Sequence, residues 1–146
     1  MDTLIPYERE VFYYETDQMN IIHHSNYIRW MEEARVDFLD QIGLTYSQLE
    51  EAGILIPVLS VSCDYKQVFR YGDVFQIKVF FEKFTGVRFR VSYEIVCKRT
   101  GQIHAVGSSE HCFATRELVP LRMKKEYPEL YQKLSMAAEG ILDNKN

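Results

Sequence analysis

The spacing of apolar residues changes once along this chain, from a helical period to an alternating one. Between Asn26 and Ile42, apolar side chains recur every three or four residues, which predicts one long helix with a wide apolar face. From Leu59 onward, apolar and polar residues alternate, as is typical of strands with one buried face. A hydrophobic helix and such a sheet must cover each other, so the pattern limits the chain to an α+β fold.

Four strands are predicted after the helix, separated by short turns. The alternating stretches lie at residues 59–65, 76–82, 87–97 and 103–114. Gly72, Gly86 and Gly101 fall in the breaks, and turns this short predict that each strand lies antiparallel beside the next. We therefore expect an antiparallel β-sheet wrapped around a long central α-helix.

Shorter elements are predicted on both sides of this unit. The aromatic segment 10–15 predicts a first strand, and residues 46–52 predict a short second helix. The tail from Met123 to Ala138 is expected to be helical, with Pro128 in a first turn, where its missing N–H costs nothing.

The ends of the long helix also carry signals. Ser25 or Asn26 is the expected N-cap, and Gly43 is placed to end the helix. No repeat, low-complexity segment or linker divides the sequence. We expect residues 1–146 to form a single domain that includes a C-terminal helical tail from about residue 123 to 146.

Composition and charge exclude several classes of protein. The net charge of −4 argues against a nucleic-acid binder, which usually has a basic face. Three cysteines without a CxxC pair argue against a disulfide framework or zinc knuckle. There is no signal-like N-terminus and no apolar run long enough to cross a membrane, so a cytoplasmic protein is expected. Abundant aromatic residues favour an oligomer.

The segment that precedes the long helix gathers residues with chemical potential. An acidic loop at Asp17, the pair His23 and His24 and the helix N-terminus fall within a few residues of one another. A helix N-terminus can stabilise an oxyanion, and a nearby carboxylate can activate water or attack a carbonyl. By spacing alone, the simpler interpretation of Asp17 is a capping or solvated side chain.

This segment resembles the active-site signature of the 4-hydroxybenzoyl-CoA thioesterase-like family, Y-x-D-T-D-x-x-G-V-V-Y-H-A-N-Y, which precedes a helix with F-F-E-x-A-R. The matching residues are Thr16-Asp17, Ile21-Ile22, His24-Ser25-Asn26-Tyr27 and Trp30-Met31-Glu32-Glu33-Ala34-Arg35. Residues 65–73 resemble a second signature, Y-x-x-P-x-x-x-G-D. The resemblance extends from about residue 9 to 115 and implies a hotdog fold.

Three positions depart from these signatures. Glu15 replaces an Asp, Asn20 replaces a Gly, and Val68 replaces a Pro. Asn is the residue that best tolerates positive φ after Gly, so we expect Asn20 to keep the same turn. Its side chain would then lie near the acyl group of a substrate.

The resemblance also implies roles for individual residues. Asp17 corresponds to the catalytic carboxylate, acting as nucleophile or general base. His24 corresponds to a residue whose ring assists catalysis in some members and whose backbone N–H polarises the carbonyl. Asn26 and Tyr27 are expected to shape the loop and start the helix, and together with Asn20 they are candidate substrate-binding residues.

Cations are needed for the phosphates of coenzyme A, and several are available. Arg88 and Arg90 on the cleanest strand are the preferred candidates. The alternative is that both are ordinary solvated side chains on the protein surface. The other cations that could serve are Lys66, Arg70 and Arg116.

Alternatives remain for the other polar residues. His23 could replace His24, whereas a metal site at this pair is disfavoured because adjacent side chains on an extended loop point apart. His104 and His111 are expected to be structural. The helix residues Glu32, Glu33 and Arg35 are expected to form a solvated face with a local ion pair.

The resemblance implies hydrolysis of a fatty or aromatic acyl-CoA to free acid and CoA, without metal or redox cofactor. It also implies a homodimer or homotetramer with sheets joined edge to edge and active sites at the interface. The alternatives are an acyl-acyl-carrier-protein thioesterase, a non-catalytic acyl-CoA-binding hotdog protein and a small β-barrel binding module. The last is disfavoured because a long buried helix would fill the barrel.

Overall fold

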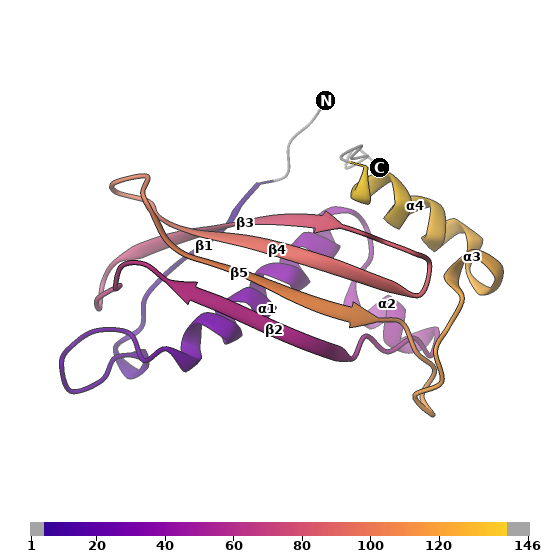
Figure 1. The fold of residues 1–146 in the computed structure, drawn as a ribbon, viewed down its shortest axis with the longest axis horizontal. Helices are drawn as coiled ribbons and strands as arrows, with labels where there is room; N and C mark the ends of the chain where they lie inside the picture. The colour runs from indigo at the N-terminus through magenta and orange to yellow at the C-terminus, as the bar shows by residue number, and fades with distance from the viewer. Residues whose placement is uncertain (1–4, 140–146) are drawn as a thin grey trace.

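The computed structural model describes residues 5–139, in which one antiparallel sheet wraps around helix α1 (Figure 1). The five strands follow the order β1-β3-β4-β5-β2 across the sheet. Their bounds are Tyr7–Glu10 for β1, Val58–Tyr65 for β2, Val74–Glu82 for β3, Arg88–Cys97 for β4 and Ile103–Cys112 for β5. The predicted wrapping of a sheet around a long central helix is therefore confirmed.

Within residues 5–139, four α-helices accompany the sheet: α1 (Ser25–Gln41), α2 (Tyr46–Glu51), α3 (Met123–Glu126) and α4 (Pro128–Ala138). The long helix ends where predicted, because Gly43 adopts a φ of 86° just beyond it. Pro128 occupies the first turn of α4, as expected. The last part of the predicted tail, residues 140–146, lies outside the described residues.

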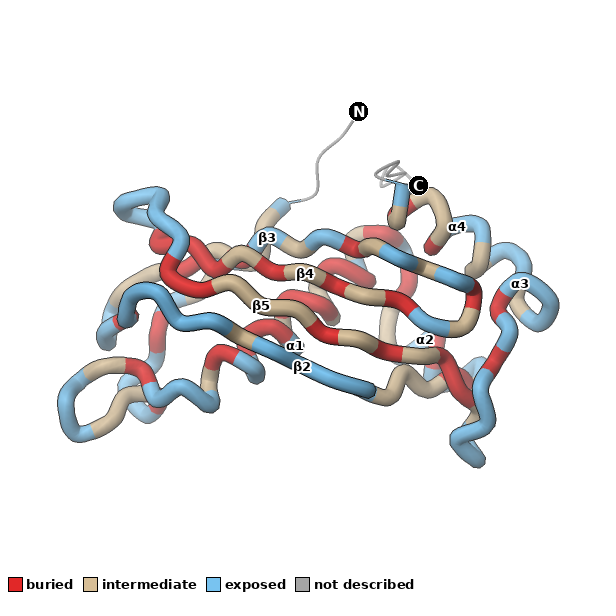
Figure 2. Tube along the Cα trace, viewed as in Figure 1, coloured by how far each residue is buried: buried red, intermediate tan, exposed pale blue. Residues whose placement is uncertain are grey.

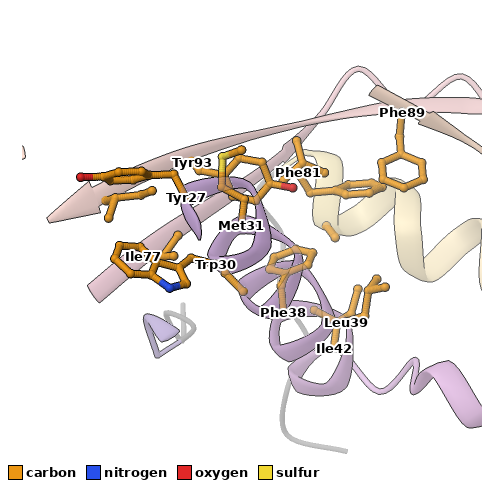
Figure 3. Close-up of a cluster of buried hydrophobic side chains, with 14 of the residues drawn as sticks. Tyr27, Trp30, Met31, Phe38, Leu39, Ile42, Ile77, Phe81, Phe89 and Tyr93 are labelled. Atoms are coloured by element: carbon orange, nitrogen blue, oxygen red, sulfur yellow. The ribbon is translucent and has the colours of Figure 1, made fainter. Parts of the chain in front are cut away.

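The core lies between α1 and the inner face of the sheet (Figure 3). Trp30 is fully buried and stacks on Phe75 with ring centroids 4.0 Å apart. Met31, the next residue, and Phe38, about two turns further along α1, also face the strands. Each such large side chain contributes about 1.5–3 kcal/mol on burial, so this face of α1 fixes the helix on the sheet.

The predicted pairing of the first two strands after the helix is wrong. Strand β2 pairs with β5 at one edge of the sheet, and β3 pairs with β1 and β4. The connection through residues 66–73 crosses beneath the sheet because Phe69 is fully buried in the core. The buried aromatic ring, and not the short turn at Gly72, determines the path of this loop.

The first predicted strand is also misplaced. Pairing occurs earlier, over β1, while Tyr13–Glu15 forms the 3-10 helix η1. The carboxylate of Glu15 accepts the N–H of Phe12 at 2.9 Å and so closes this turn. A local side-chain bond therefore overrides the strand preference of the aromatic residues.

Strand β2 forms a sheet edge that is exposed along nearly its whole length (Figure 2). Its apolar residues include Leu59 at 44% exposure, Val61 at 39% and Tyr65 at 48%. An exposed apolar edge offers unpaired backbone groups to another strand.

Within the described residues, no helix is long and apolar enough to cross a membrane.

Candidate active site

The loop between η1 and α1 folds back on itself as a narrow hairpin. Asp17 donates its backbone N–H to the carbonyl of Ile21 at 2.8 Å. At the tip, Asn20 has a φ of 66°, in the left-handed region that Gly and Asn tolerate best. The prediction that Asn20 keeps the positive-φ turn of the signature glycine is confirmed.

The carboxylate of Asp17 is half-buried within this hairpin. Its Oδ1 accepts the N–H groups of Met19 at 2.8 Å and Ile21 at 3.4 Å. Among residues 5–139, no group donates a hydrogen bond to Oδ2. One oxygen is therefore held by the loop, and the other is available to a substrate or water molecule.

Helix α1 begins directly after the hairpin, and its N-cap is His24. The prediction that Ser25 or Asn26 caps this helix is wrong. Ser25 donates its N–H to the Nδ1 of His23 at 3.2 Å, and the Asn26 amide donates to the carbonyls of Glu15 and His23. The backbone N–H of His24 has no acceptor among the described residues, which leaves it free to polarise a carbonyl.

The rings of His23 and His24 stack with centroids 4.4 Å apart. The expectation that they point apart is therefore wrong, because His24 already has helical backbone angles (φ −59°, ψ −26°). The His24 ring also meets the ring of Tyr65 edge-on at 6.2 Å. Within the part of the chain described, no three His, Cys, Asp or Glu side chains are grouped to hold a metal ion.

An aromatic wall formed by Tyr27, Tyr65 and Phe69 lies beside the helix start. Tyr27 is 3% exposed, and its ring lies 4.9 Å from that of Tyr65 and 6.3 Å from that of Phe69. Burial raises the pKa of Tyr27 to about 12, so its phenol stays neutral near pH 7. Tyr65 is the accessible end of this wall.

Sequence reasoning missed a buried carboxylate that supports the hairpin. Glu15 is 2% exposed and accepts bonds from Arg9 at 2.6 Å, from the Trp30 indole at 2.9 Å and from the N–H of Phe12. Burial alone raises the pKa of Glu15, but these donors outweigh burial and hold it below its ordinary value. The available signal was the replacement of the signature Asp by Glu.

The two arginines predicted to bind coenzyme A lie far from Asp17 within one chain. Arg90 is paired with Glu82 at 3.4 Å and Glu110 at 3.3 Å, so its charge is already compensated. Arg88 is exposed and forms no ion pair within residues 5–139. The strand register places both at the end of the sheet opposite Tyr65.

The predicted solvated face of α1 is wrong for Arg35 and Glu33. Arg35 is 5% exposed because it lies one turn after Met31 and faces the sheet, where it donates to the Tyr93 hydroxyl at 3.3 Å. Glu33 pairs with Arg9 of β1 at 3.0 Å. Helix spacing alone could not reveal this partner, which comes from a distant segment.

Comparison with known proteins places this arrangement in a family. The model of the thioesterase-like superfamily matches residues 11–133. The chain belongs to this superfamily. The thioesterase resemblance of its hairpin and helix start is therefore confirmed at the level of the family, and so is the prediction of a thioester hydrolase.

Similar proteins of the superfamily cover most of the chain. A structure described as a DHNA-CoA thioesterase from Staphylococcus aureus has 31% identity and a TM-score of 0.85, and covers 92% of this chain and 93% of its own. The Bacillus subtilis (strain 168) protein named "Putative acyl-CoA thioesterase YneP" is 32% identical over 84% of this chain and 88% of its own length. A 1,4-dihydroxy-2-naphthoyl-CoA hydrolase from Thermosynechococcus vestitus is 23% identical over 72% of each. The hotdog fold is thereby confirmed.

Proposed function

We propose that this chain hydrolyses acyl-CoA thioesters with Asp17 as the catalytic carboxylate. The observation that carries the proposal is the hairpin, which holds Oδ1 and leaves Oδ2 free next to the start of α1. The free N–H of His24 is the donor that polarises the thioester carbonyl, and its ring meets that of Tyr65 edge-on. Asn20, Asn26 and Tyr27 shape the site.

The chemistry needs only these groups and water. In the general-base route, Oδ2 takes a proton from water while the water oxygen attacks the carbonyl carbon. In the nucleophilic route, Oδ2 itself forms the bond, and water then hydrolyses the resulting anhydride. In both routes the His24 N–H donates to the carbonyl oxygen and stabilises the negative charge that develops there. The C–S bond then breaks, and CoA leaves as the thiolate, which takes up a proton.

An aromatic acyl group fits this site better than a long alkyl chain. The accessible part of Tyr65, backed by Tyr27 and Phe69, offers a flat ring surface against which another ring can stack. The names of two similar proteins, which include DHNA-CoA and 1,4-dihydroxy-2-naphthoyl-CoA, agree with this choice. Rates on aromatic acyl-CoA and fatty acyl-CoA of increasing length test this preference.

A homodimer joined through β2 accounts for the remote position of Arg88. A two-fold axis across this edge pairs β2 antiparallel with its copy, so the Val58 end of one strand lies beside the Tyr65 end of the other. Since Arg88 lies at the Val58 end of the sheet, the axis brings Arg88 of the partner subunit toward the Asp17 hairpin. There it can bind a phosphate of coenzyme A.

The decisive experiment is the substitution Asp17→Asn, which preserves shape and removes the charge and basicity. Turnover of the best acyl-CoA substrate is expected to fall by about 1,000-fold or more, a loss of roughly 4 kcal/mol of transition-state stabilisation. Unfolding temperature should be unchanged, and Asp40→Asn at the exposed end of α1, away from the hairpin and from β2, is the matched control. Near-normal hydrolysis by pure Asp17→Asn protein would refute the mechanism. The same acyl group on an acyl carrier protein tests the other carrier.

A further inference from the structure

Glu15 connects three separate parts of the molecule through one buried carboxylate. Two N–H groups of Arg9 reach it from β1 at 2.6 and 3.1 Å, and the indole of Trp30 reaches it from α1 at 2.9 Å. A fourth donor, the N–H of Phe12, comes from the chain just before η1. Four donors to one carboxylate make this the most heavily bonded side chain near Asp17.

The main chain of Glu15 holds the hairpin at the same time. Its carbonyl accepts the backbone N–H of His23 at 2.9 Å and the side-chain amide of Asn26 at 3.1 Å. His23 and Asn26 flank the N-cap of α1, and Asp17 follows only two residues after Glu15. Glu15 is therefore the residue through which the Asp17 arm of the hairpin is joined to the helix start.

Beyond Glu15, the hairpin is held mainly by backbone pairing. Gln18, Met19 and Asn20 are exposed, and the carboxylate of Asp17 bonds only to the N–H groups of its own loop. A second attachment lies on the return arm, where Ile22 donates its N–H to the carbonyl of Phe69 at 2.9 Å. The arm that carries Asp17 is paired with this return arm through Thr16 and Ile22, and Glu15 joins it to the helix start.

We propose that Glu15 is the positioning residue of the active site, which fixes the Asp17 carboxylate relative to the free N–H of His24. This inference rests on the proposed function, because it assigns Glu15 a role through Asp17. A carboxylate and an oxyanion donor must be held in a narrow geometry, and a misplacement of about 1 Å can cost on the order of 100-fold in rate. A buried, ionised anchor supplies that constraint.

The charge of the anchor is essential to this role. The Arg9 guanidinium lies between Glu15 and Glu33, with its Nε 3.0 Å from the Glu33 carboxylate. It also lies 4.3 Å from the centre of the Phe12 ring. A neutral amide at position 15 keeps the shape, but in either orientation its NH2 group faces a donor of Arg9 and either the Phe12 N–H or the Trp30 indole, where only an acceptor fits. The hairpin base then loosens while the distant core keeps its contacts.

The test compares Glu15→Gln with Glu33→Gln, which removes the same charge from the same arginine without touching the hairpin. In Glu15→Gln, kcat is expected to fall by about 10- to 100-fold with KM within about twofold, since substrate contacts remain. Glu33→Gln should keep kcat within about threefold. Glu15→Asp, which retains the charge, should recover most of the loss.

Amide hydrogen exchange provides a readout that does not depend on activity. In Glu15→Gln, the N–H groups of Asp17 and His23 should exchange at least about tenfold faster, while those of β4 stay protected. If Glu15→Gln does not fold, Arg9→Lys replaces it, because lysine keeps the charge and loses the paired bonds. It should show an intermediate fall in kcat and the same local exchange.

Two results would overturn the proposal. One is unchanged exchange at Asp17 and His23 in the variants. The other is faster exchange with a kcat equal to that of Glu33→Gln, in a protein whose Asp17→Asn variant is inactive. If Asp17→Asn is itself active, the proposed function fails and the positioning role fails with it, while the exchange data still report whether the anchor exists.

Discussion

At the scale of single residues, the apolar core contains a series of polar side chains that are hydrogen-bonded to one another. Arg35 donates to the Tyr93 hydroxyl, which shares a 2.7 Å bond with Ser109, and Ser109 shares another of 2.7 Å with His111. Within the described residues, Arg35 forms no ion pair with a carboxylate. The positive charge of Arg35 therefore bears directly on the ionisation of His111.

His111 should make the fold sensitive to mild acid. Burial, reinforced by Arg35, lowers the pKa of His111 to about 4 from its ordinary value of 6.5. Between these two pH values the unfolded chain binds a proton at His111 and the folded chain does not. The free energy of unfolding therefore falls as pH drops from about 6.5 toward 4. The loss is on the order of 3 kcal/mol over that window.

The measurement is urea unfolding at pH values from 7.5 to about 4.5, in the parent and in His111→Gln. Glu15, whose pKa its donors hold below the ordinary value, is present in both proteins, so its contribution near the acid end cancels. His104, whose pKa burial also lowers, remains in both proteins and cancels in the comparison. A parent and variant with the same slope would show that His111 does not carry this dependence.

At the scale of elements, the contact between α1 and the sheet depends on the absence of a side chain at Gly107. A Cβ atom there would lie 2.5 Å from the sulfur of Met31 and 2.9 Å from the carbonyl oxygen of Ser62. Gly107→Ala is therefore expected to lower the free energy of unfolding by about 1–3 kcal/mol through overpacking.

A double-mutant cycle with Met31→Ala locates the origin of that loss. Because truncating Met31 removes the closest clash, the double variant should be less destabilised than the sum of the two single variants. Denaturant unfolding of the four proteins gives the coupling energy directly. Strict additivity would show that Gly107 is not required for the approach of α1.

The elements themselves could be predicted because each has a local period. Helix α1 and strands β2 to β5 lie within a few residues of the positions that apolar spacing indicated. The misplacements arose where a single side chain outweighed the pattern: Glu15 closes η1, and Phe69 carries the chain beneath the sheet so that β2 pairs with β5. Neither effect has a period, so sequence patterns do not reveal them.

The residues of the candidate site also differ in whether the sequence could predict them. The motif match led to Asp17, His24 and Asn20, because a hairpin followed by a helix start is contiguous in sequence. The anchor of that hairpin was missed, because Arg9 and Trp30 meet Glu15 only after β1, η1 and α1 are packed together. The burial of Arg35 was missed for the same reason, since its partner Tyr93 belongs to β4.

At the scale of the whole molecule, the proposed homodimer makes the exposed β2 edge responsible for completing the site. Val61 lies at the middle of this edge, where a two-fold axis would place it close to its own copy. Val61→Lys introduces two like charges at that point and should convert the proposed dimer to a monomer. Because Arg88 of the partner subunit would then be lost from the site, KM for acyl-CoA should rise by about tenfold or more.

Phe80→Lys is the control, since Phe80 is 44% exposed on β3, near the opposite edge of the sheet. Sedimentation measures the assembly state and steady-state kinetics measure KM, both at several protein concentrations. Arg88→Ala in an intact dimer should raise KM for acyl-CoA in the same way without changing sedimentation. If the Val61→Lys protein is monomeric and its KM is normal, the coenzyme A contacts lie within one chain. If the parent is a dimer and Val61→Lys remains one, the interface does not lie at β2.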